Sequence, residues 1–154
     1  MERARDESRR GTLVNATLEE ARAELNVRCD SIEECYEYML AYAGQGLPAE
    51  PGGGASSQIR DYLKKCDAAL TGLAEFIGGF VKRLDAGAFA AYAAFLGVID
   101  RDARDAQAAV QLVLAQPSIS SQLVDNLNAS IHLRALLTDL FLIDEVLKAQ
   151  RQAG

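Results

Sequence analysis

Regular spacing of apolar residues predicts two long helices in the middle of the chain. Apolar positions recur at steps of three and four in two consecutive series. Heptad spacing of this kind places apolar side chains on one face of a helix. Because about three residues separate the two series, we expect the helices to fold back as an antiparallel hairpin. The predicted helices cover residues 57–84, with apolar positions from Ile59 to Leu84, and 87–115, with apolar positions from Phe89 to Val113.

Two capping signatures predict further helices before this hairpin. In each signature a Thr or Ser is followed three residues later by Glu, the arrangement of a capping box at a helix start. A loop rich in Gly and Pro, residues 44–55, then separates these helices from the hairpin. The signatures are Thr17–Glu20 and Ser31–Glu34, and the helices that they predict cover residues 17–28 and 31–43.

The last predicted helix, residues 118–150, has an apolar face that changes direction. Pro117 or Ser118 begins it. At 100° per residue, an upstream stripe is rotated by more than a quarter turn from a downstream one. A helix that is apolar on several sides is buried on several sides, so we expect a central helix or a subunit interface. The upstream stripe is Leu123, Val124, Leu127 and Ile131; the downstream stripe is Leu133, Leu136, Leu140, Ile143 and Leu147; the candidate interface residues are Leu137, Phe141 and Leu142.

Composition supports the same fold class. The chain has 26 Ala and 20 Leu against 8 Val, 7 Ile and 4 Thr, and Ala and Leu are the stronger helix formers. We therefore expect an all-α protein, an antiparallel helical bundle of four main helices plus a short N-terminal helix. Its 154 residues are enough for one domain, predicted over 13–154, after a charge-dense, mobile N-terminal tail over 1–12.

Two glycines inside the 57–84 helix allow two interpretations. Gly78 and Gly79 lie opposite Ala93 and Ala94 if the hairpin turns near residue 86, so the backbones can approach closely. On this interpretation a large side chain at Gly79 is strongly destabilising. The alternative is that the glycines open a ligand pocket. The aromatic residues that would line such a pocket are Phe76, Phe80, Tyr92 and Phe95.

Charge and cysteine content exclude several classes of function. The net charge is −6 and the pI about 4.8, which argues against nucleic-acid binding, since that needs a basic face. No apolar run approaches the roughly 20 residues that span a bilayer, and no signal peptide is visible, so we expect a cytoplasmic protein without a membrane partner. The three cysteines form no CxxC motif and are expected to be reduced thiols.

Candidate catalytic and metal-binding residues are few. His132 is the single histidine, and Glu-x-x-His pairs of the di-iron type are absent; it is either a haem ligand or a boundary residue. Asp102 and Asp105 form a carboxylate pair that suits acid–base chemistry or a solvated face beside arginines. Tyr36 and Tyr38 mark either an exposed contact patch or half-buried bundle positions. We expect no metal, no cofactor and no catalytic constellation.

These observations favour a non-enzymatic helical interaction protein, an adaptor or assembly factor, that acts as a homo-oligomer and binds a protein partner. The alternative is a small-molecule-binding or catalytic helical bundle with an aromatic-lined pocket. No motif in the chain identifies a family, and a helical bundle without motifs carries little functional information.

Overall fold

The structure is a computed structural model that describes residues 2–49, 54–84, 87 and 89–153. The described residues form six helices and no strand, so the predicted all-α class is confirmed. The arrangement differs from the predicted one, because the N-terminal helix is the longest and two of the predicted long helices are interrupted. The helices are α1 (Glu2–Gly44), α2 (Gly54–Leu70), α3 (Leu73–Leu84), α4 (Phe89–Leu114), α5 (Ser121–Ala129) and α6 (His132–Ala153).

Helix α1 is continuous where two helices were predicted. Ser31, the predicted cap of the second helix, donates its hydroxyl to the Val27 carbonyl at 3.0 Å, so it follows the helix instead of beginning one. The helix ends near Gly44, and Gly46 then adopts a left-handed conformation with φ 65°. Residues 2–12, predicted as a tail, continue the same helix; their mobility stays a prediction.

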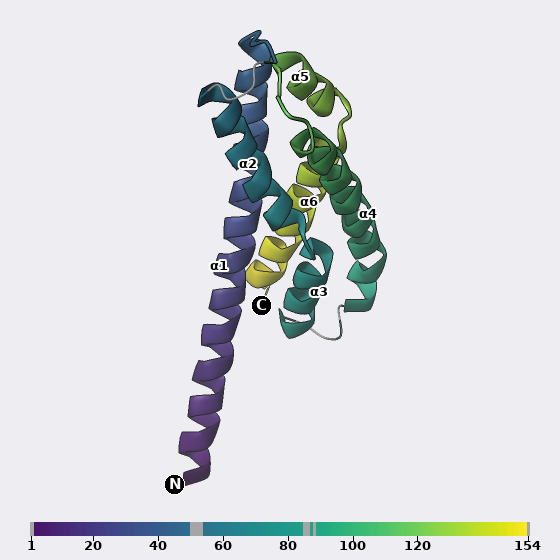
Figure 1. The fold of residues 1–154 in the computed structure, drawn as a ribbon. Helices are drawn as coiled ribbons and strands as arrows, with labels where there is room; N and C mark the ends of the chain where they lie inside the picture. Colours follow the sequence, from purple (N-terminus) through teal and green to yellow (C-terminus); the bar gives the residue numbers. More distant parts are fainter. Residues whose placement is uncertain (1, 50–53, 85–86, 88, 154) are drawn as a thin grey trace.

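The C-terminal half of α1 forms one wall of the bundle, while its N-terminal part extends past the other helices (Figure 1). At 1.5 Å per residue, its 43 residues make a helix about 65 Å long. Helices α2, α3, α5 and α6 all pack against α1, and α4 packs against α2, α3, α5 and α6. The buried face of α1 consists of Ile32, Cys35, Met39 and Tyr42.

The predicted helix 57–84 is interrupted at Gly72, which has φ 65° and separates α2 from α3. The spacing of the apolar residues nevertheless predicts their burial correctly, from Ile59 through Phe80, with Leu84 half-buried. The Arg28 guanidinium of α1 donates to the carbonyl of Thr71 at 2.9 Å and so satisfies a backbone acceptor at the break. Helix α4 confirms the second prediction, because its inward positions from Leu96 to Val113 are buried.

The predicted helix 118–150 is two helices that meet at Ile131, whose φ of 63° is rare for a β-branched residue. Helix α5 is capped by Ser120, which accepts from the Leu123 backbone N–H, and neither Pro117 nor Ser118 lies inside it. The break lies between the two apolar stripes. The change of apolar direction therefore marks a change of helix axis and not a single helix buried on several sides.

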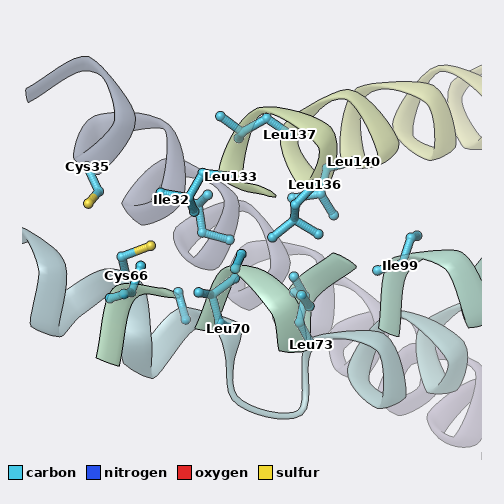
Figure 2. Packing of buried hydrophobic residues seen from close by; sticks show 14 of the residues in the cluster. Ile32, Cys35, Cys66, Leu70, Leu73, Ile99, Leu133, Leu136, Leu137 and Leu140 are labelled. Atoms are coloured by element: carbon cyan, nitrogen blue, oxygen red, sulfur yellow. The ribbon is translucent and has the colours of Figure 1, made fainter. Parts of the chain in front are cut away.

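Leucines of α6 complete the core. In Figure 2, Leu136 of α6 faces Leu70 and Leu73, while Leu137 lies on another side of the same helix. A buried polar contact ties the two ends of the chain together, because Ser121 donates to the Tyr42 carbonyl at 2.6 Å and accepts from the Leu47 backbone N–H at 2.7 Å. Within the described residues, none of the helices combines the length and apolar character that crossing a lipid bilayer requires.

The close-packing interpretation of the two glycines is wrong. Gly79 is exposed, and a Cβ placed on it meets no atom within 4 Å. Gly78 is buried, but a Cβ there would make ordinary contacts of 3.6 Å with Leu96 and 3.8 Å with Phe89. The predicted partners Ala93 and Ala94 are both exposed. The error came from placing the glycines on the inner face by counting from the turn.

Two glycine substitutions should therefore have opposite effects. Gly79→Ala should raise the free energy of unfolding by about 0.5–1 kcal/mol, because Ala loses less conformational freedom in a helix. Gly72→Ala should lower it by about 1–2 kcal/mol, because a left-handed conformation is strained for a residue with a Cβ. Urea unfolding of both variants measures the difference; a loss of stability in Gly79→Ala would restore the close-packing interpretation.

Candidate functional site

Helix α6 presents an apolar face to solvent. Phe141 is 56% exposed, Leu142 54% and Val146 39%, and their spacing places them on one side of the helix. The third predicted interface residue, Leu137, is only 6% exposed and belongs to the core of its own chain. The structure therefore leaves two of the three predicted interface residues available and adds Val146.

A crevice between α1, α3 and α6 lies beside Phe141. Its volume is ≈190 Å³, below the roughly 300–1,000 Å³ of typical small-molecule pockets. A crevice of this size accommodates side chains of a partner better than a whole cofactor. The residues that line it are Arg22, Leu25, Asn26, Cys29, Asp30 and Glu33 of α1, Ile77 and Phe80 of α3, and Leu140, Phe141, Ile143, Asp144 and Leu147 of α6.

Carboxylates make the crevice acidic. Burial raises the pKa of the Cys29 thiol to about 11, and the charges of Glu33, Asp144 and Asp30 raise it further in the same direction. The pKa of Glu33 is also raised, by burial first and then by Asp30, Glu37 and Asp144. Cys29 is therefore a neutral thiol at pH 7 and a poor nucleophile. The guanidinium of Arg22 lies 5.2 Å from the centre of the Phe80 ring at the same crevice.

The four aromatic residues of the predicted pocket do not share one described cavity. Phe80 lines the crevice, whereas Phe76 is covered by the Arg28 guanidinium, 4.8 Å from the ring centre. Tyr92 and Phe95 are half-buried against the core. A wider groove of ≈460 Å³ runs along α3 and α4 beside the two glycines, and its aromatic side chain is Phe89, which the sequence analysis did not assign to a pocket.

A carboxyl pair connects α4 and α6. Burial, a hydrogen bond with Asp102 and the charge of Asp102 raise the pKa of Asp139 to about 7. The Oδ2 atom of Asp139 is buried and accepts no hydrogen bond within the described residues, as expected if it carries the shared proton. Sequence reasoning proposed Asp102 but paired it with Asp105, which is exposed; the true partner lies on another helix.

Other residues with chemical potential have structural surroundings. His132 is half-buried at the first position of α6. Cys35 and Cys66 are buried and face each other from α1 and α2 (Figure 2), and their mutual hydrogen bond and burial raise the pKa of Cys66. No group of three or more His, Cys, Asp or Glu in the described part of the chain is arranged to hold a metal ion.

The predicted tyrosine patch is half-buried. Tyr36 and Tyr38 both pack against the core. Tyr38 stacks on Tyr62 of α2 with ring centres 4.3 Å apart and donates its hydroxyl to Gln58 at 2.8 Å. The structure thus places these side chains as the bundle interpretation expects, between α1 and α2.

The carboxyl pair predicts a pH-dependent stability. Because the pKa of Asp139 is raised in the folded state, the folded protein holds a proton that the unfolded chain loses near pH 4. The free energy of unfolding should therefore fall as pH rises from about 4 to about 7. Asp139→Asn, which keeps the shape and donates to Asp102, should remove most of this fall and be more stable than the native chain at pH 8, by roughly 1 kcal/mol.

Urea unfolding between pH 4 and pH 8 measures this effect, with Asp105→Asn, an exposed carboxylate on the same helix, as the control. A native chain whose pH profile matches that of Asp139→Asn would contradict a shared proton at this site.

Comparison of this chain with protein-family models, with curated protein sequences and with solved structures found no match. What the protein does is therefore argued from the apolar face of α6, the crevice beside it and the carboxyl pair.

Proposed function

We propose that the protein is a non-enzymatic helical interaction protein, an adaptor or assembly factor, that acts as a cytoplasmic homo-oligomer. The observation that carries the proposal is the exposed apolar face of α6, formed by Phe141, Leu142 and Val146. Monomeric proteins rarely leave neighbouring large apolar side chains in water. A surface of this kind is typical of a contact with another protein.

The energetics favour association of two copies through this face. Burial of one Leu or Phe side chain contributes roughly 1.5–3 kcal/mol. In a two-fold symmetric contact each residue is used twice, so these three residues supply enough to offset the cost of association, about 4–15 kcal/mol. The crevice next to Phe141 adds further apolar surface to the same side of the molecule.

The chemistry of the candidate residues supports an interaction role over catalysis. The Cys29 thiol is protonated at neutral pH, and a protonated thiol is a weak nucleophile. The Asp139 carboxyl lies between two helices and has a buried oxygen, where a substrate does not reach it. The alternative, an aromatic-lined ligand pocket, has no observation in its favour, since Phe76, Tyr92 and Phe95 do not line the crevice or the groove.

Light scattering tests the proposal. The native chain at micromolar concentration should have at least twice the 16.6 kDa mass of one chain, and Phe141→Glu should shift it towards one chain, because a carboxylate in an apolar contact is costly to bury. The matched control is Leu112→Glu on α4, where the native side chain is 67% exposed and lies outside this face. Circular dichroism verifies that both variants remain folded. A native mass of one chain would refute the proposal.

A further inference from the structure

The occupant of the acidic crevice is an open structural question that the chain itself answers. We propose that the projecting N-terminal part of α1 from a second copy lies across this crevice, antiparallel to α1 of the first copy, and that the contact is reciprocal. This inference rests on the proposed homo-oligomer and names the segment that forms it. A crevice of ≈190 Å³ is too small to enclose a helix, but it accepts side chains from a helix that crosses it.

The course of α1 leaves its first turns available for such a contact. The backbone is helical from Glu2, and Figure 1 shows that the N-terminal part continues well beyond α3 and the end of α6. Residues 2–17 of this part span about 24 Å at 1.5 Å per residue. That length matches several helical turns of a partner helix, which is enough to cover the crevice beside α1.

Charge complementarity selects a second copy as the occupant. Residues 2–12 contain four arginines and three acidic residues, whereas residues 18–37 contain seven acidic residues and two arginines. The acidic part of α1 includes Asp30 and Glu33 of the crevice, and Asp144 of α6 adds a third carboxylate there. An antiparallel pair of α1 helices therefore places the arginine-rich part of each copy beside the acidic part of the other.

Apolar spacing gives the register of this pair. Positions 14, 18, 21 and 25 are Val, Leu, Ala and Leu at steps of four, three and four, the spacing of a two-helix contact. Two-fold antiparallel pairing that brings position 18 opposite 21 also brings 14 opposite 25, and 9 opposite 30. Leu25 already lines the crevice and Leu18 is only partly buried by its own bundle. The same register thus satisfies both the apolar and the charged positions, with Arg9 facing Asp30.

Charge reversal on each side tests the contact. One variant carries Arg9→Glu and Arg10→Glu, and the other carries Asp30→Arg and Glu33→Arg. Each variant alone places like charges opposite each other in both halves of a symmetric pair, so its dimer dissociation constant should rise on the order of tenfold or more. A chain with all four substitutions should regain the native dissociation constant, because the charges are again opposite.

A mixture of the two variants provides a second readout. Within a mixed pair, the acidic terminus of one chain meets the basic crevice of the other, and the native pairing of signs holds in the second half. The mixture should therefore form a heterodimer, measured by light scattering or native mass spectrometry, while each variant alone is mainly monomeric. The matched control reverses Asp61 and Asp125, two exposed carboxylates on α2 and α5, and should dimerise as the native chain does.

The outcomes separate this inference from the proposed function. A native oligomer that tolerates all the reversals would overturn the α1 contact and leave association through α6 in place. A native chain that is monomeric at every concentration would overturn the proposed function, and the α1 contact with it. Heterodimer formation from two otherwise monomeric variants supports both, since only a reciprocal contact with opposite charges explains it.

Discussion

The fold depends on one continuous helix whose inner face is covered by four others. Ile32, Cys35, Met39 and Tyr42 of α1 are buried, and α2, α3, α5 and α6 all contact this helix. Its C-terminal end is fixed by the buried Ser121, which bonds the backbone on both sides of the α1 terminus. A straight helix held at one end by a packed bundle projects at the other. The exposed N-terminal part and the crevice beside α1 are both consequences of this single constraint.

Sequence alone predicts burial far better than helix boundaries in this protein. The positions from Ile59 to Phe80 are buried as their spacing indicates, because heptad spacing reports which side of a helix faces the core. The same spacing continues across Gly72, so it gives no warning that the helix is interrupted there. At Ser31 the opposite error occurs, since a Ser three residues before Glu resembles a cap, while its hydroxyl bonds within a continuous helix.

The candidate site was only partly predictable for a related reason. Phe141 and Leu142 stand out because they lie off the main apolar stripe of their helix, and they are exposed. Leu137 also lies off that stripe but is buried, because α1 and α5 as well as α4 pack on α6. Asp139 and the acidic crevice depend on which helices become neighbours. Pairs such as Asp102 with Asp139 leave no signal in the spacing of a single sequence.

The bond between Ser121 and Tyr42 joins residues 79 positions apart, which has a consequence for how the chain folds. Helical proteins usually fold quickly because their contacts are local. Here the inner face of α1, the first helix to be synthesised, is completed by α5 and α6, the last two. During synthesis the α1 face therefore stays uncovered until the C-terminal helices emerge. The assembly of this bundle is thus governed by long-range closure, as in many β-sheet proteins, although every regular element described is helical.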